Sequence, residues 1–520
     1  MSPLMVLDDQ NAYPRPVGAL SAEPVAGPPQ MLQVSDGSGL LATFTAGAKT
    51  VTVRGQRRTF TERKRPFVDS FARTVSSGWG QSPGGGTWLN LAGSDALFSV
   101  DGSQGVIVND TANTGRYASV NDGDIADVSA SCKVTASKTA TGATTSIAMT
   151  FGYVDSSNHY RARLLINTTG TVQLALEKTV GGTTTTLGSA ATVGSGFTAG
   201  QWWHIRVQRT GSTVRCRAWL DGTAEPSVWL HSATDTALPT GRVGLRSFAS
   251  TGSTAMPFNT LVDEVAVDSA VWANPPTVTH DTWVRVLNAP FNGTWTTGLA
   301  NRVRAWSADS TPDVLAYAMM YVTGAPAVTS PALDGRKVFG EAQYGPLKPD
   351  GTRSEFSDWN DYIGVPWTYP NGETRGFPHG EITVSGCLDC SGFVRTVYGR
   401  HLGIPMVFDQ NFDGINLPRR TRDIGPSGPG VLIQDSTGVP PPLAGMHPGD
   451  VVLFDADQSE PVEGQIDHNG IYLGQDPSGN HRFISSRKVV SGPTFSDLGG
   501  PSTLNGTGTY AKRLRKIRRF

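Results

Sequence analysis

Two residues, Cys390 and His468, have the types and the order in the chain that catalysis by a cysteine nucleophile requires. The cysteine lies in the run GCLDCSGFVR at 386–395, and the histidine follows in IDHNGIYLG at 466–474. A thiolate attacks a carbonyl carbon, while an imidazole takes the thiol proton and returns it to the leaving amine. The pair therefore predicts acyl transfer through a thioester.

The segments around these two residues predict the elements that would position them. Residues 391–398 are expected to continue a helix that begins at Cys390, with Asp389 before it in a structural, capping role. The partial positive charge of a helix N-terminus, together with a neighbouring imidazole, favours thiolate at neutral pH. Backbone N–H groups of the same turn can donate to the oxyanion. His468 is expected to open a strand that continues through the apolar residues 471–473.

The run DCSGFV at 389–394 resembles the nucleophile motif of the NlpC-type family of papain-like cell-wall peptidases. Three further blocks continue the resemblance in the same order: LPRRT at 417–421, PGDVVLF at 448–454 and HNGIYLG at 468–474. The resemblance implies a papain-like α+β cysteine peptidase domain over 346–520, with Cys390 as nucleophile and His468 as base. His447 is the competing imidazole, but it lies in a turn where solvent exposure is the simpler interpretation.

The same resemblance implies a third polar residue, usually His, Asn or Gln, on the strand after the histidine. Ser485 occupies the matching position in FISS at 483–486, and His481 on the same strand is the alternative. Serine can accept a hydrogen bond from the ring but orients it less well. The family also has a tyrosine near the oxyanion. Trp367 stands at that place here, and Tyr369 is the candidate substitute.

Cys387 and Cys390 form a Cys-x-x-Cys, a spacing that suits a redox pair or half of a zinc site. No second such pair completes a zinc site, so neither metal nor cofactor is predicted. Cys387 is interpreted as a chance neighbour of the nucleophile, with a regulatory disulfide as the alternative. The other two cysteines, Cys132 and Cys216, fall in expected strands.

Length and charge limit the remaining possibilities. A chain of 520 residues is too long for one core, which predicts a multidomain protein. A net charge of -1 argues against bulk electrostatic binding to nucleic acid or to an anionic membrane. No apolar run is long enough for a membrane span. The N-terminus does not read as a secretory signal, so a wall enzyme would need another route to its substrate.

Residues 68–270 predict a β-sandwich, because apolar and polar residues alternate in many short runs separated by turn signals. QWWHIRV at 201–207 and LVDEVAV at 261–267 resemble concanavalin-like (laminin-G-like) sandwiches, which often bind glycans. Exposed tryptophans could stack on a sugar, although in sandwiches they more often belong to the core. The candidates are Trp79, Trp88, Trp219 and Trp229.

The flanking segments have other patterns. Residues 1–37 are expected to form an extended arm and 38–67 a short β segment for docking or linkage. Residues 279–345 are expected to form a helical linker that packs on the peptidase. It would hold one helix at 295–306, with Leu299, Val303 and Trp306 on one face.

A second linker helix is expected through 314–321, capped by Thr311 with Pro312 at its first position. At the other end of the chain, the basic run 512–520 is interpreted as an edge strand with a solvated cationic face. Contact with anionic wall polymers is the functional alternative for this run.

The fold class expected is therefore mainly β plus α+β, a sandwich followed by the peptidase domain. YGPL at 344–347 and FISSRK at 483–488 further resemble a subset of these peptidases in tail proteins of phages that infect actinobacteria. The segments 38–62 and 279–295 also resemble that subset, as though the sandwich were inserted between them.

The resemblance implies a minor tail protein at the virion tail tip that cuts peptidoglycan stem peptides at the host cell wall. Expected partners are those peptides, a cell-surface glycan bound by the sandwich, other tail proteins and further copies of the chain. Two alternatives stay open: an adhesive tail-tip protein with an inactive peptidase fold, and a bacterial wall-remodelling peptidase.

Overall fold

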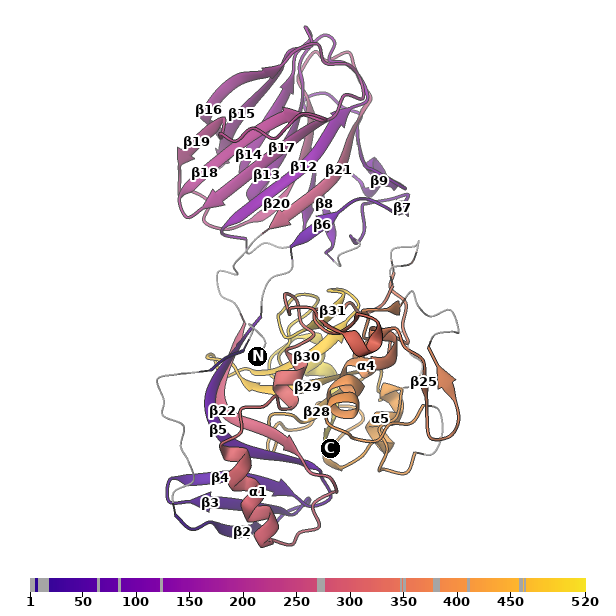
Figure 1. Cartoon of the computed structure of the whole chain (residues 1–520). Coiled ribbons are helices and arrows are strands. Elements are labelled where there is room, and N and C mark those ends of the chain that lie inside the picture. Colours follow the sequence, from indigo (N-terminus) through magenta and orange to yellow (C-terminus); the bar gives the residue numbers. More distant parts are fainter. Residues whose placement is uncertain are drawn as a thin grey trace. The chain divides into compact units, whose positions relative to one another are not determined.

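The structure is a computed structural model with two units, and each is described by itself (Figure 1). Unit 1 comprises Met1–Glu62, Pro275–Pro346 and Arg353–Phe520, and unit 2 comprises Arg63–Asn274 and Leu347–Thr352. The residues that the structure describes are 5–7, 18–62, 66–82, 86–121, 125–268, 276–346, 348, 352–376, 384–408, 412–457, 462 and 464–520.

Unit 2 is a sandwich of two antiparallel sheets. One sheet has the order β19-β18-β17-β12-β21-β10-β9-β7, with β6 also paired to β21, and the other has the order β16-β15-β14-β13-β20-β11-β8. The strands of the first sheet are β6 (Phe67–Asp69), β7 (Thr74–Val75), β9 (Phe98–Asp101), β10 (Gly105–Asn109), β12 (Val128–Ala136), β17 (Trp203–Thr210), β18 (Thr213–Leu220), β19 (His231–Thr234) and β21 (Phe258–Asp268). Those of the second are β8 (Trp88–Ala92), β11 (Arg116–Val120), β13 (Thr145–Asp155), β14 (Asn158–Ile166), β15 (Val172–Val180), β16 (Thr183–Gly194) and β20 (Arg242–Ala249), and a short 3-10 turn, η1 (Asp95–Leu97), precedes β9.

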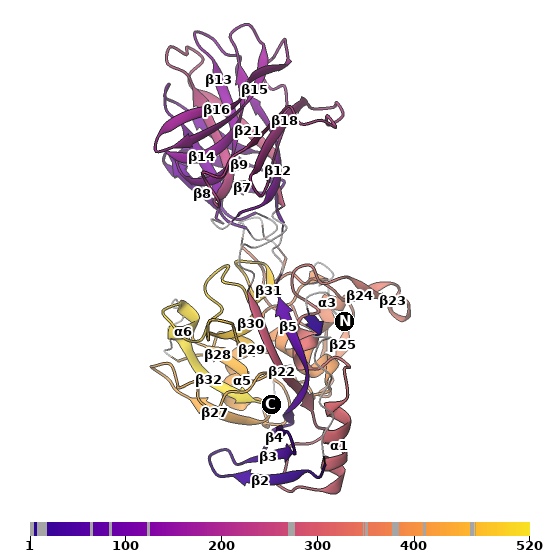
Figure 2. The same ribbon diagram turned by 90° about the vertical axis from the view of Figure 1, so that its left-hand side faces the viewer.

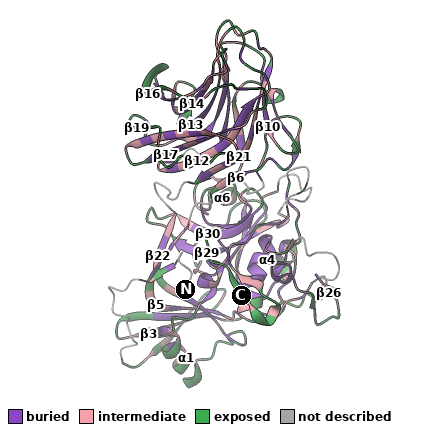
Figure 3. Ribbon diagram, turned by 45° about the horizontal axis from the view of Figure 1, so that its top comes forward, coloured by how far each residue is buried: buried purple, intermediate pink, exposed green. Residues whose placement is uncertain are grey.

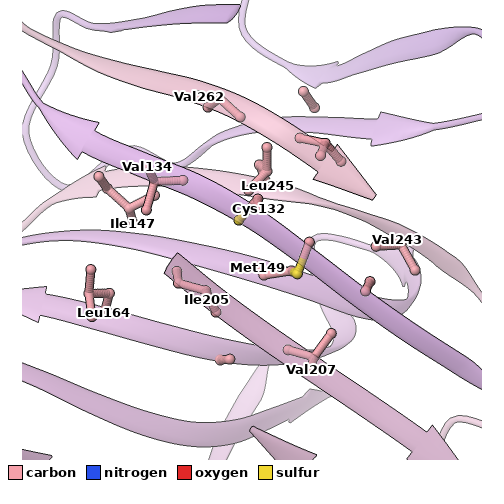
Figure 4. Close-up of a cluster of buried hydrophobic side chains, with 14 of the residues drawn as sticks. Cys132, Val134, Ile147, Met149, Leu164, Ile205, Val207, Val243, Leu245 and Val262 are labelled. Atoms are coloured by element: carbon pink, nitrogen blue, oxygen red, sulfur yellow. The ribbon is translucent and has the colours of Figure 1, made fainter. Parts of the chain in front are cut away.

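The inner faces of these sheets supply one core, which Figure 4 shows around Cys132 and Met149. The alternation read from the sequence is the cause, since Val172, Leu174 and Leu176 are buried there while Gln173 is not. The predicted sandwich is therefore confirmed.

The four candidate tryptophans divide into two pairs. Trp79 and Trp88 lie in the core, as sandwich tryptophans usually do. Trp219 and Trp229 remain partly exposed. Trp219 stacks on His204, and Trp229 lies against two arginines, so both surface tryptophans already have partners within the unit.

The N-terminal part of unit 1 forms a sheet of the order β1-β5-β4-β3-β2, with β22 also paired to β5. Its strands are β1 (Met5–Leu7), β2 (Ser21–Val25), β3 (Met31–Asp36), β4 (Gly39–Thr45), β5 (Thr50–Thr61) and β22 (Thr277–Val286). The expected extended arm at 1–37 is therefore wrong where β2 and β3 form, while 1–4 and 8–17 lie outside the described residues. At the other end of the sheet, Thr61 pairs with Thr277, which brings the two ends of the inserted sequence together.

The linker contains α1 (Thr297–Ser307) and α2 (Val314–Ala318). α1 confirms the helix expected at 295–306, but its apolar face packs on β4 and β5 of the N-terminal sheet and not, as expected, on the C-terminal domain (Figure 2). α2 is shorter than expected, and its N-cap is Asp313, not Thr311. The Asp313 carboxylate accepts from the N–H of Ala316 and pairs with buried Arg58, a partner that lies 255 residues away in the sequence.

The C-terminal part of unit 1 has a sheet of the order β27-β32-β28-β29-β30-β31, whose central strands are buried (Figure 3). These strands are β27 (Val431–Asp435), β28 (Val451–Phe454), β29 (His468–Gln475), β30 (His481–Arg487), β31 (Gly492–Thr494) and β32 (Leu514–Arg519). The other elements here are β23 (Val328–Ser330), the 3-10 turn η2 (Pro331–Leu333), β24 (Arg336–Phe339), α3 (Trp359–Ile363), β25 (Trp367–Thr368), β26 (Thr374–Arg375), α4 (Cys390–Arg395), the π-helical turn η4 (Thr396–His401), α5 (Thr421–Ser427) and α6 (Thr509–Arg513).

The basic run 512–520 corrects the sequence interpretation. β32 lies between β27 and β28 and is not an edge strand. Its arginines are buried, because Arg519 pairs with Asp450 at 2.8 Å and Arg518 donates to the carbonyl oxygens of Gly425 and Gly428. A solvated cationic face is therefore wrong for this strand.

The hydrophobic core around the C-terminal sheet extends beyond 346–520, the bounds expected for the C-terminal domain. Met5, Phe60, Val278 and Val284 belong to the same buried cluster as Phe393 of α4. The backbone carbonyl of Phe520 also accepts from the N–H groups of Lys49 and Thr50. Residues 346–520 therefore share one folded unit with 1–62 and 275–346. None of the helices in the described part of the chain is long and apolar enough to cross a membrane.

Candidate active site

Cys390 is the first residue of α4, and Asp389 is the N-cap of this helix. The Asp389 carboxylate accepts from the N–H of Gly392 at 2.7 Å, which satisfies one of the donors that a helix leaves open at its start. The structural role predicted for Asp389 is confirmed. The cap also fixes where the helix begins, and therefore where the thiol lies.

A buried network of charges holds the start of α4. Arg419 donates to Asp389 at 2.6 Å, and Arg395 of α4 donates to Asp358 at 3.0 Å. Tyr369 joins the second pair, since its hydroxyl donates to Asp358 at 3.0 Å and accepts from Arg395 at 2.7 Å. Buried ions of this kind are tolerated only when they are paired and hydrogen-bonded. The network therefore fixes the backbone under the nucleophile.

Tyr369, the expected substitute for the family tyrosine, is thus part of this network and does not line the cleft at Cys390. Tyr344 lines that cleft instead. Tyr344 stands in YGPL, a block that carries the resemblance but does not by itself predict a position in the site. Trp367, at the family position, is 43% exposed and packs edge-on against Trp359.

Cys390 and His468 line one cleft of about 680 Å³. Its walls come from the start of α4, the start of β29, the end of β30 and α6. The lining carries charges of both signs: the cations are Arg419, Arg420, Arg422, Arg487 and Lys488, and the acids are Glu355, Asp389, Asp457 and Asp467. Arg419 pairs with Asp389 and Lys488 with Glu355, so the lining offers both signs of charge to a substrate although part of it is already paired.

The Cys390 thiol has two polar neighbours. Its Sγ lies 3.5 Å from Thr421 Oγ1 and 3.9 Å from the carbonyl oxygen of Asp467. Thr421 stands in one of the blocks that carry the family resemblance, but its position there does not by itself predict a contact with the thiol.

His468 is the first residue of β29, where it pairs with Phe454 of β28. Its ring lies against Tyr510, with centroids 5.2 Å apart, and Phe454 lies at 6.0 Å. Nε2 is buried and has no hydrogen-bond partner among the residues that the structure describes. Nε2 therefore has a free hydrogen-bonding position that an orienting residue would be expected to fill.

The third predicted residue, Ser485, has a different contact. Its Oγ accepts from Nε of Arg487 at 3.0 Å, and within the described part of the chain no hydrogen bond joins it to His468. Arg487 lies 4.4 Å over the ring of Tyr510. The alternative, His481, bonds to Tyr472 at 2.8 Å and does not line the cleft. Neither residue orients the His468 ring in this structure.

The electrostatics of the pair differ from the sequence expectation. Burial raises the pKa of the Cys390 thiol to about 12, and the nearby Asp389 carboxylate acts in the same direction. Burial also lowers the pKa of His468 to about 3, and the positive charge of Arg487 adds to this. The resting pair is therefore a neutral thiol and a neutral imidazole, although the sequence predicted a thiolate.

Residues 369–496, which include both side chains, match the model of the NlpC/P60 family. The chain therefore carries an NlpC/P60 domain, as the resemblance in the sequence implied. A search of curated proteins found no match.

Several solved structures resemble part of the chain. A carbohydrate-binding module (CBM66) from Bacillus subtilis is 15% identical over 35% of this chain and 95% of its own, with a TM-score of 0.26. A β-glucanase from Bacillus licheniformis is 14% identical over 39% of this chain and 98% of its own, with a TM-score of 0.28. A β-1,3-glucanase from Mycobacterium marinum is 15% identical over 39% of this chain and 99% of its own, with a TM-score of 0.28.

The second cysteine of the motif, Cys387, is buried and does not line the NlpC/P60 cleft. Burial raises its pKa to about 11. Both cysteines are free thiols in this structure. Among the described residues there is no group of three or more His, Cys, Asp or Glu side chains that could hold a metal ion.

Proposed function

We propose that this chain is a phage minor tail protein whose NlpC/P60 domain hydrolyses an amide bond in peptidoglycan stem peptides. The observation that carries the proposal is that Cys390, at the start of α4, and His468, at the start of β29, line one cleft within the matched residues. A cysteine and a histidine from different elements that share a cleft fit the requirements of acyl transfer.

In the proposed reaction, His468 takes the thiol proton of Cys390 as Sγ attacks the amide carbon. The oxyanion would accept hydrogen bonds from backbone N–H groups at the start of α4. The C–N bond then breaks, the amine leaves with the proton from the imidazolium, and the acyl group remains as a thioester. His468 next takes a proton from water, the resulting hydroxide attacks the thioester, and the acid and the free thiol are released.

The neutral resting pair affects the first step. Because burial disfavours both the thiolate and the imidazolium, proton transfer would accompany attack on the bound substrate. A stem peptide bears both carboxylates and amines, and the mixed charges of the cleft lining suit such a substrate. Arg420 would receive a carboxylate and Asp457 an amine, while Lys488 and Glu355, which pair with each other in the wall of the cleft, would exchange that partner for the substrate's charged groups.

The sandwich would serve attachment to a cell-surface glycan or assembly with other tail proteins. Its insertion between β5 and β22 supports a separate task, because the core of unit 2 is formed by its own two sheets. We place the protein at the virion tail tip, where it would act on the host wall next to other tail proteins and further copies of itself.

The test compares the full chain with Cys390→Ala and Cys387→Ala on purified peptidoglycan, with the released muropeptides identified by mass. Cys390→Ala should abolish release, and Cys387→Ala, the matched control three residues away, should retain most of it. Equal loss in the two variants would instead indicate a paired-cysteine mechanism.

One observation favours a second candidate, an adhesive tail protein whose peptidase fold is inactive. Nε2 of His468 lacks a hydrogen-bond partner among the described residues, so no hydrogen bond to this atom orients the ring for proton transfer. Failure of the wild-type chain to release any peptide, with wall binding retained, would support this candidate and refute hydrolysis.

A further inference from the structure

The outer face of the seven-stranded sheet in unit 2 has an unusual row of residues. Strand register places Tyr117 of β11 beside Arg246 of β20, then Ala148 of β13 and Arg163 of β14. The neighbouring row holds Gly244, Thr150, Arg161 and Glu177 in the same strand order. These residues face away from the core, since their neighbours along the strands, such as Ile147 and Leu245, lie in it.

β13 forms the floor of this face. Its outward residues Ser146, Ala148 and Thr150 are all small, and all are buried although they face outward. The register places long side chains on both sides of them, with Arg246 on one strand and Arg161 and Arg163 on the other. The small residues of β13 are covered by the long side chains on the two neighbouring strands, so a ligand would contact the arginines first and would reach β13 only if they turned outward.

Arg246 is the unusual member of the face. Only 9% of its surface is exposed. Among the described residues, no carboxylate lies within ion-pair distance of it. Its Nε is buried without a hydrogen-bond partner. The guanidinium lies 4.1 Å from the ring of Phe248 and 5.6 Å from that of Tyr117. A buried cation without a counter-ion is unfavourable unless an anion joins it.

The nearby arginines do not supply the missing charge. Arg161 and Arg163 share one carboxylate, with Nε-to-oxygen distances of 2.7 and 3.0 Å to Glu177. Three guanidinium groups therefore face one carboxylate. The charges of Arg161 and Arg163 add to burial in lowering the pKa of Arg246, which reflects how close the three cations lie.

An aromatic cluster borders the same face. The rings of Tyr117, Tyr153 and His159 lie with centroids 5.6 to 5.8 Å apart. His159 is fully buried, and its Nε2 has no hydrogen-bond partner within the described residues. A second unsatisfied polar atom thus lies beneath the same face as Arg246.

From these observations we infer that the outer face of β11, β20, β13 and β14 binds an anionic carbohydrate polymer, whose carboxylate or phosphate group pairs with Arg246. A guanidinium recognises either anion through two parallel hydrogen bonds. Sugar units on either side of the anion would lie along β13 and against the aromatic cluster. The inference rests on the attachment role proposed for unit 2, and it requires no hydrolysis.

Binding to the full chain is measured by calorimetry at two salt concentrations, with soluble probes that the peptidase cannot cut. The probes are trigalacturonic acid, a glycerol phosphate oligomer, inorganic phosphate and neutral maltotriose. We expect at least one of the two anionic oligomers to bind more tightly than maltotriose, and to bind more weakly at high salt. The oligomer that binds identifies carboxylate or phosphate as the natural group.

Arg246→Met should weaken this binding by about tenfold to a hundredfold, because a charge-assisted hydrogen bond is lost. It should not lower the melting temperature, since it removes an unpaired buried cation. Arg206→Met is the matched control: Arg206 lies on β17 of the other sheet and pairs with Glu225, and its loss should leave binding unchanged. Arg246→Lys keeps the charge and should bind with intermediate strength, which provides the test if Arg246→Met does not fold.

Three results would overturn the inference: no binding of either anionic oligomer, equal binding of maltotriose, or equal loss in Arg206→Met and Arg246→Met. Binding of inorganic phosphate alone would also overturn it, since no polymer is then recognised. Peptide release from the wall is scored separately, so a failure of the proposed hydrolysis remains a distinct result.

Discussion

The two sides of the NlpC/P60 cleft are held by different means. On the nucleophile side, Asp389, Arg419, Asp358 and Arg395 form buried ion pairs that fix the start of α4. On the imidazole side, His468 lies between aromatic rings. Arg487, whose charge acts on His468, bonds to neutral oxygens and not to a carboxylate in the described part of the chain.

The difference shows which of the two side chains, the thiol or the imidazole, is positioned more firmly in this site. The thiol is placed by a network in which each charge has an opposite partner, so its position is fixed before substrate arrives. The imidazole is kept neutral by burial and by the charge of Arg487, and its Nε2 is left without a partner. The nucleophile is thus fixed by charge, and the base is placed only by packing.

Breaking the charged side should have the largest effect. Asp358→Asn leaves Arg395 buried with a weakened partner, which should lower the free energy of unfolding of unit 1 by about 3 to 5 kcal/mol. Peptide release should fall with it. Urea unfolding, followed by tryptophan fluorescence and residual activity, measures both effects.

The matched control is Asp435→Asn, which removes an exposed ion pair with Lys516 in the same unit and should change stability by about 1 kcal/mol or less. The pKa of Asp358 lies below its usual 3.8, because the charges of Arg395 and Arg419 outweigh burial. Its stabilisation is therefore present above pH 3.8 and is lost as the pH falls further. Equal changes in the two variants would mean that the network does not hold α4.

These two sides also differ in how well the sequence predicts them. The cap at Asp389 and the start of α4 are local, because the capping residue lies beside the turn that it satisfies. The sandwich was predictable for the same reason, since the alternation of apolar and polar residues along a single strand indicates which of its faces is buried. The strand at 514–519 was also predicted, but its burial was not, because Arg519 is neutralised by Asp450, 69 residues earlier in the chain.

The surroundings of the imidazole depend on such distant contacts as well. Tyr510 lies against His468 from α6, and Tyr344 reaches the cleft from a segment before the motif. Local patterns in a single sequence do not predict which side chains from distant parts of the chain come into contact. The family resemblance predicted Ser485 as the orienting residue from its position alone. In the structure Ser485 is instead hydrogen-bonded to Arg487, two residues further along β30.

A change on the imidazole side should alter pH dependence more than stability. Arg487→Met removes a positive charge beside His468, so the pKa of His468 should rise from about 3 while burial still keeps it below 6.5. The acidic limb of kcat/KM should move to higher pH, since the base must be neutral. A pH profile from 3 to 8, with the histidine followed by NMR, measures the shift.

Arg482→Met is the control, because Arg482 lies on the same strand but pairs with Asp476 and Asp497. Arg482→Met should leave the acidic limb of the kcat/KM profile at the same pH as in the wild type. The buried neutral imidazole also affects stability: the unfolded chain binds a proton below about pH 6.5 that folded His468 does not take up until about pH 3. Stability should therefore fall between these two values as the pH is lowered. An acidic limb that moves equally in both variants would show that Arg487 does not act on His468.

The smallest effect is expected at Ser485. Because its Oγ bonds to Arg487 and not to His468 among the described residues, Ser485→Ala should lower kcat by about tenfold or less, the worth of one neutral hydrogen bond. His481→Ala should change kcat even less, since His481 bonds to Tyr472 and Gln475 outside the cleft. A loss of more than a hundredfold in either variant would make that residue the orienter.

Ser485→Asn provides the positive test. An amide oxygen at this position could accept from Nε2–H of His468, the atom now without a partner there, and should raise kcat above that of the wild type. If Ser485→Asn is slower than Ser485→Ala, the aromatic packing of His468 already orients the ring, and the two sides of the cleft are equally fixed.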